Sequence, residues 1–201
     1  MFTDLSLAVL IQRVVAIIVI AGVHGCILAG IARLLGDRTP QYDGRLTLMP
    51  FKHLSLLGLV SAIAARAGWI EPMDLDPAQM RWGRWGLVVC VFVSLALLAL
   101  FGVVVLNLRL AVLSVVDPGA AMYVIAGMTV TGEMALFYAL FNLIPLPPLT
   151  GAHLLTAAKP EWAQVLTRQT RWLAIALVVV MILTRGTWLD PVVRAIRGVV
   201  G

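Results

Sequence analysis

The sequence predicts an all-α polytopic membrane protein with about four to five transmembrane helices. Of its 201 residues, 61% are hydrophobic and only 12% are charged, whereas a soluble domain carries about a quarter charged residues. Several apolar runs approach or exceed the roughly 20 residues that a helix needs to cross hydrocarbon, and charged loops separate them. The length suits a single membrane domain, residues 1–201, with enough helices to enclose a site.

The first apolar run extends from about Val14 to Leu35. It has neither a basic segment before it nor a small-residue cleavage site after it, so we expect a retained anchor. In the polar loop that follows, residues 44–49 alternate in polarity beside an Asp-Gly turn, which predicts a small β-hairpin. The next apolar run, Leu54–Ile70, contains Arg66 and is short for a span, so it is expected to be interfacial or re-entrant.

Three later runs complete the predicted membrane helices. Two are long, from Trp85 to about Leu108 and from about Ala120 to Leu146. The third, Trp172 to Leu183, is short, so its helix is expected to begin earlier, within the mixed segment 147–171. After it, residues 190–200 place valines and isoleucine on one helical face and arginines on another, which predicts a surface-lying amphipathic helix.

The net charge of the chain is +5. Because the arginines lie between apolar runs, we interpret them as loop charges that orient the chain, and no nucleic-acid partner is expected. If Leu54–Ile70 does not cross, most lysines and arginines fall on one side, which the positive-inside rule makes cytoplasmic. If it does cross, the charges divide more evenly. The arrangement with about four spans is therefore favoured.

Two stretches carry a resemblance to a known family: HGCILAGIARLLGDRTPQYDGRLTLMPFKH, from His24 to His53, and FNLIPLPPLTGAHLL, from Phe141 to Leu155. They resemble the site-2 protease family of intramembrane zinc metalloproteases in its compact bacterial form. That family has a helix with H-E-x-x-H, a Leu-Gly-Asp turn, G-R-L-T-L-N-P, and later F-N-L-x-P-x-P-P-L-D-G. The resemblance implies a core of about residues 14–155, a C-terminal span and amphipathic helix of about residues 171–200, and an inner (cytoplasmic) membrane location.

The residues of this family that hold zinc are mostly replaced here. In the family, two histidines one helical turn apart and an aspartate bind the metal, and the glutamate beside the first histidine activates water. The corresponding positions in this chain are His24, Gly25, Leu28 and Thr150. One of three ligands remains and the general base is missing. The resemblance therefore implies an inactive member in which no catalytic residue and no metal cofactor are expected.

An alternative metal site would combine His24 with Glu133, the one carboxylate inside a predicted span. Intramembrane ionisable groups are functional candidates by default, and His53 and His153 are expected near the mouth of the same cleft. A simpler interpretation is a protonated Glu133 hydrogen-bonded to a backbone carbonyl or a nearby threonine. His24 is then a hydrogen-bonded core histidine.

The proline-rich stretch after Asn142 is the candidate binding element. Pro145 and Pro147 break the helix, and in the family this kinked stretch lies near the active site and is thought to help position substrate. With Asn142 and both prolines present, a substrate-like transmembrane segment could be held without being cut. A purely structural turn explains the prolines equally well.

Three functions follow from these observations. The favoured one is a catalytically inactive site-2 protease-like protein that binds other integral membrane proteins, as a scaffold subunit of a membrane complex. The alternative is an active intramembrane zinc metalloprotease with non-standard ligands, the only case in which a zinc cofactor is expected. A transporter or channel component is the weakest, because the predicted spans contain no file of polar residues.

Overall fold

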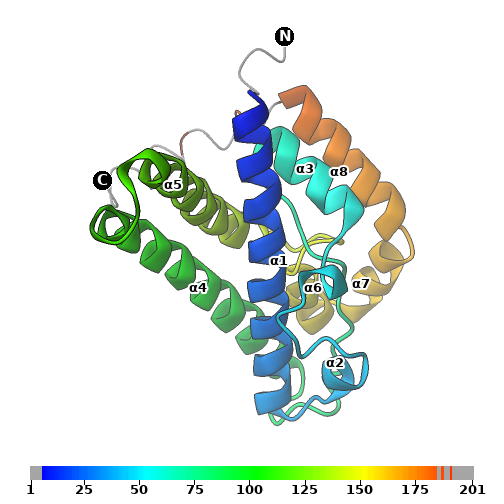
Figure 1. The fold of residues 1–201 in the computed structure, drawn as a ribbon. Helices are drawn as coiled ribbons and strands as arrows, with labels where there is room; N and C mark the ends of the chain where they lie inside the picture. Colours follow the sequence, from blue (N-terminus) through cyan, green and yellow to red (C-terminus); the bar gives the residue numbers. More distant parts are fainter. Residues whose placement is uncertain (1–5, 185–186, 188–190, 192–201) are drawn as a thin grey trace.

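The computed structural model describes residues 6–184, 187 and 191 of the chain (Figure 1). The predicted amphipathic helix of residues 190–200 lies almost wholly outside them. Throughout the described part the elements are helical, and none is a strand. In chain order they are α1 (Leu7–Leu35), α2 (Thr39–Tyr42), η1 (Pro50–Lys52), α3 (Leu56–Ala65), α4 (Arg84–Leu108), η2 (Arg109–Ser114), α5 (Pro118–Phe141), α6 (Ala152–Ala158), α7 (Pro160–Thr167) and α8 (Thr170–Thr184).

Within the described residues, three helical segments are long and apolar enough to cross a membrane: α1, α4 with its extension η2, and α5. A fourth span is possible if α7 and α8, which are bent by 75° at their junction, form one broken span. The prediction of an all-helical membrane protein is confirmed. The predicted number of spans is matched only at its lower end, and only if the bent pair crosses.

Helix α1 stands between two helix pairs, α4 with α5 on one side and α3 with α8 on the other (Figure 1). The α4–α5 pair packs closely because glycines face each other, and a Cβ atom on Gly102 would lie 2.9 Å from the Gly132 carbonyl oxygen. Helix α1 ends at Gly36, whose φ of 114° suits glycine and allows the left-handed cap. The buried apolar residues of α1, α4 and α5 form the main core.

The short apolar run 54–70 folds back on itself, and for this shape it is called the re-entrant segment below. Its helix α3 has ten residues, about 15 Å at 1.5 Å per residue, too short to span. An antiparallel bridge joins Leu54 to Ile70, and the Glu71 amide donates to the His53 carbonyl at 2.7 Å. Because its ends are joined, both ends of this run lie next to each other in the fold, an arrangement compatible with the favoured orientation.

The predicted β-hairpin at residues 44–49 is wrong. The Asp-Gly turn does form, with Gly44 at a φ of 68°, but no strand in the described part of the chain pairs with the residues after it. The Thr47 amide donates locally to the Arg45 carbonyl at 2.9 Å, and the Thr47 carbonyl accepts from a histidine ring. Alternating polarity predicts an exposed extended segment but cannot supply a partner strand.

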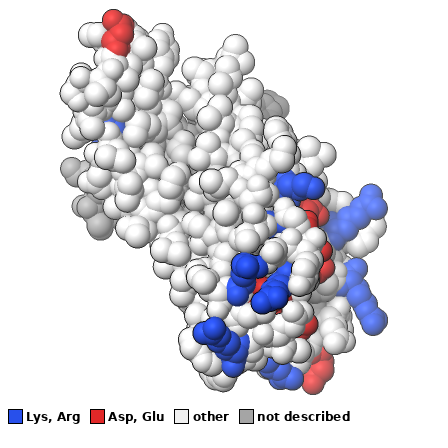
Figure 2. Space-filling model, turned by 60° about the horizontal axis from the view of Figure 1, so that its bottom comes forward, with Lys and Arg blue, Asp and Glu red and all other residues white. Residues whose placement is uncertain are grey.

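Lysine and arginine side chains gather at one end of the molecule, which carries α2 and the loop between α1 and α4 (Figures 1 and 2). The distribution agrees with the orientation predicted from the sequence, in which this end faces the cytoplasm.

Candidate functional site

The site forms where the middle of α1 meets the loop of residues 142–151, which follows α5. His24 projects from α1 and is fully buried. Its Nε2 atom lies 3.0 Å from the hydroxyl oxygen of Thr150, a residue 126 positions away in the sequence. The two positions that match zinc ligands in the resembled family are therefore neighbours in this fold.

Asn142 holds this loop in place. Its side-chain amide donates to the Gly68 carbonyl at 2.9 Å and to the Tyr138 carbonyl at 3.0 Å, and its side-chain carbonyl accepts from the Thr150 amide at 3.3 Å. The Gly151 amide closes the loop by donating to the Asn142 backbone carbonyl at 2.7 Å. Asn142 thus connects α5, the 142–151 loop and the re-entrant segment.

The Thr150 hydroxyl lies between two possible partners, His24 Nε2 at 3.0 Å and the side-chain oxygen of Asn142 at 3.5 Å. The tautomer of His24 decides whether Nε2 donates to this hydroxyl or accepts from it. His24 Nδ1 finds no hydrogen-bond partner within the described residues. The His24 ring also meets the edge of Tyr138, with centroids 5.3 Å apart. His24 is a buried, hydrogen-bonded histidine.

The position of the family's glutamate is occupied by another side chain. At Gly25, the residue next to His24, a Cβ atom would lie only 2.6 Å from Cε1 of His53 and closer still to Nδ1. His53 is itself buried, and its Nε2 atom lies 2.9 Å from the Thr47 carbonyl oxygen. The imidazole of His53 therefore fills the space in which a side chain at position 25 would begin.

Burial lowers the pKa of His53, an effect that the Thr47 carbonyl opposes and Arg45 reinforces. Its Nδ1 atom, like that of His24, is buried and finds no partner in the described part of the chain. The site therefore contains two imidazole nitrogens whose hydrogen-bonding capacity is unused.

Leu28 occupies the position of the second histidine ligand and is 1% exposed. It borders a cleft of about 220 Å³ that Thr150, Pro147, His153 and the extended segment 72–75 also line. Burial lowers the pKa of His153 to about 4, although Asp74 nearby acts in the opposite direction. His153 thus lines the cleft at Leu28, whereas His53 lies against Gly25.

The remaining sequence candidates lie around this cleft or away from it. Pro145 is exposed on the 142–151 loop, and Pro147 is buried in the cleft wall. Glu133 is half-buried on α5, nine positions before Asn142. Across the described residues, no three side chains of His, Cys, Asp or Glu form a group that could hold a metal ion.

One residue of the site and one contact within it were not identified from the sequence. Tyr138 accepts from the Ile70 amide at 2.9 Å and so positions the re-entrant segment beside His24. A tyrosine one helical turn before Asn142 was an available signal, because residues i and i+4 share a helix face. The contact between Gly25 and His53 had no local signal, since it depends on how the intervening loop folds back on α1.

Comparisons with known proteins give one informative match. No family model matches the chain, and no solved structure matches it. A protein of Bacillus subtilis (strain 168) described as "Putative zinc metalloprotease YwhC" is 30% identical over 169 residues, which cover 79% of this chain and 74% of that protein.

Proposed function

The chain belongs to the metalloprotease-like family of YwhC, and we propose that it is a catalytically inactive, site-2 protease-like member that binds other integral membrane proteins as a scaffold subunit. The observation that carries this proposal is the set of donor atoms around His24. A catalytic zinc needs three protein ligands and a position for water. Around His24 the fold offers a threonine hydroxyl at 3.0 Å and the apolar side chain of Leu28. These residues do not fit the zinc that the name of the relative implies.

The general base is also missing, and its place is closed. Gly25 has no side chain to accept a proton from water. The ring of His53 lies where such a side chain would begin. The ring of His53 therefore fills the space next to the position of the missing base, which supports a role that does not depend on proteolysis.

One observation favours the alternative, an active protease with non-standard ligands. His24 and His53 each present a buried Nδ1 atom without a partner in the described residues, and neutral imidazole nitrogen is a common metal ligand. Two nitrogens without a carboxylate or third histidine fall short of a catalytic set. Because they are buried, a metal here would also lack a path for substrate, which favours the inactive interpretation.

The cleft beside Leu28 is the proposed binding element. Asn142 is fully buried and its amide donates to internal carbonyls, so its proposed contribution is to shape the loop that borders the cleft. Pro147 and the extended segment 72–75 line the cleft. A segment of another membrane protein held there would lie next to the vestigial site without meeting a nucleophile.

Photo-cross-linking in native membranes tests this proposal. A photoreactive amino acid at Met73, in the cleft wall, is expected to capture a membrane protein of defined mass. The same label at Val104, which is 45% exposed on the outer surface of α4, is the matched control and is expected to give only diffuse lipid adducts. No discrete adduct from Met73, or the same adduct from both positions, would overturn the binding role.

A further inference from the structure

The bend between α7 and α8 relates the direction of α7 to that of α8. The two helices meet at 75° and together meet the length and hydropathy of a broken span. Helix α8 has fifteen residues, most of them apolar, which make about 22 Å of helix. If α8 runs across the bilayer, a helix joined to it at this angle lies close to the plane of the membrane surface.

The two faces of α7 differ. Trp162 and Val165 are 64% and 57% exposed and project from one face, whereas Ala163, on the face toward α6, is buried at 5% exposure. Trp172, just beyond the bend, is 70% exposed. Tryptophan is enriched where bilayer and water meet, because its ring is apolar and its N–H is polar. This face is exposed among the described residues and suits the boundary of the hydrocarbon layer.

Positive charge flanks this apolar face. The segment 159–171 holds Lys159, Arg168 and Arg171 against one acid, Glu161, a net charge of +2 from 3 − 1. Lys159 extends its ammonium group to 6.0 Å from the centroid of the Trp162 ring. Cations beside an interfacial apolar face favour a surface that carries anionic phospholipid.

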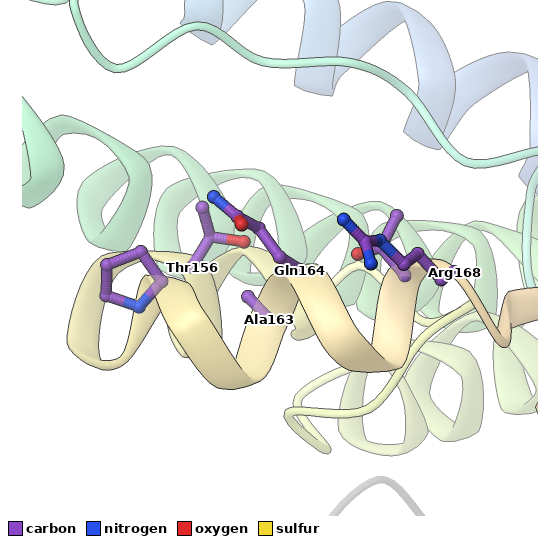
Figure 3. Close-up of a pocket in the computed structure, with 6 residues that line it drawn as sticks. Thr156, Ala163, Gln164 and Arg168 are labelled. Carbon is purple, nitrogen blue, oxygen red and sulfur yellow. The ribbon is translucent and has the colours of Figure 1, made fainter.

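A shallow groove separates α7 from α6. Its volume is about 320 Å³, and it is lined by Thr156, Pro160, Ala163, Gln164, Thr167 and Arg168. Figure 3 shows Gln164 and Arg168 projecting from the same side of α7, next to Thr156. None of the lining residues is acidic. A guanidinium and an amide directed into one groove are suitable donors for a phosphate group.

We propose that α7 lies in the headgroup layer on the lysine- and arginine-rich side of the membrane, where it inserts Trp162 and Val165 and binds anionic phospholipid through Lys159, Arg168 and Arg171. This inference rests on the bend, the exposed apolar face and the charges. It does not depend on whether the vestigial site binds a protein.

Quenching of Trp162 fluorescence tests the proposal. The contribution of Trp162 is the difference between the full chain and its Trp162→Phe variant, reconstituted in vesicles of phosphatidylcholine and phosphatidylglycerol. Brominated phospholipids are expected to quench it more than aqueous iodide does. Brominated phosphatidylglycerol is expected to quench it more than brominated phosphatidylcholine.

Charge variants separate specific binding from general attraction. The double variant Arg168→Gln with Arg171→Gln is expected to lower the preference of the protein for phosphatidylglycerol over phosphatidylcholine by about fivefold per charge removed. The matched control, Arg38→Gln with Arg81→Gln, removes two exposed arginines from the loops that follow α1 and precede α4 and is expected to change it little. Quenching of Trp162 by iodide but not by brominated lipid would place α7 in water and overturn the proposal. Equal effects of both charge pairs would overturn the anionic-lipid site on α7.

Discussion

Two buried polar clusters on α1 differ in how completely their hydrogen bonds are made. At the end of α1, Asp37 is fully buried and its carboxylate accepts from the Thr39 and Asp76 amides, each at 2.9 Å. In the middle of α1, His24 and His53 are equally buried, yet each has an Nδ1 atom without a partner in the described residues. Buried polar groups are normally satisfied. The first cluster, called the latch below, has both of these hydrogen bonds formed, whereas the second leaves one nitrogen of each imidazole ring without a partner in the described residues.

The largest effect is expected at the latch. Asp37→Ala leaves two half-buried amides, those of Thr39 and Asp76, without their acceptor and should lower the free energy of unfolding in detergent by about 3 kcal/mol. Asp43→Ala, an exposed carboxylate in the next turn, is the control and should change it by less than about 0.5 kcal/mol. Equal effects of the two substitutions would show that Asp37 is not a latch.

The next effect tests the closed position beside His24. Gly25→Ala forces a Cβ atom against the His53 ring and should cost about 2 kcal/mol of unfolding free energy. Combined with His53→Ala, the same change should cost close to nothing, because the clash is gone. Gly127→Ala, where a Cβ atom meets open space, should be neutral or stabilising. Additive effects of Gly25→Ala and His53→Ala would contradict the contact.

A smaller effect is expected at His24 and Thr150, the two positions that match zinc ligands in the resembled family. His24→Leu with Thr150→Val removes both partners of one hydrogen bond and the orphaned Nδ1 atom together. Replacing both partners by apolar groups of similar shape can be nearly neutral, so the free energy of unfolding should change by less than about 1 kcal/mol. A loss as large as that of Asp37→Ala would mean that His24 belongs to a satisfied network.

The smallest effect concerns pH. The pKa of His153 is lowered to about 4 from a usual value of 6.5, so the unfolded chain binds a proton at a higher pH than the folded chain does. Stability from this residue is therefore present above about pH 6.5 and is lost as the pH falls toward 4. Unfolding titrations of His153→Gln should show a flatter pH dependence in that window. An unchanged slope would contradict the shift.

Hydropathy predicted the long helices because a membrane span needs a continuous apolar stretch. It placed the start of the first helix at Val14, whereas α1 begins at Leu7. The cause is Arg13, which ends the apolar run in the sequence but in the fold is buried and donates to the Ile63 carbonyl at the end of α3. A hydropathy pattern assigns such an arginine to a loop, because the sequence does not show the backbone carbonyl that accepts its hydrogen bond in the fold.

The site was predictable only in part. The motif resemblance matched His24 and Thr150 to two zinc-ligand positions of the family, and in the fold these two side chains lie 3.0 Å apart. It could not show that His53 fills the space beside Gly25, because that contact arises from the path of residues 38–53, where the predicted hairpin did not form. Local polarity predicts which residues are exposed, whereas the approach of one ring to a distant helix depends on tertiary packing.

The zinc content of the purified full-length chain tests the central claim most directly. The donor atoms around His24 predict substoichiometric zinc by elemental analysis after dialysis, with no difference between the wild-type chain and His24→Ala. One tightly held zinc per chain that disappears in His24→Ala would contradict the claim and establish a metal centre at this site.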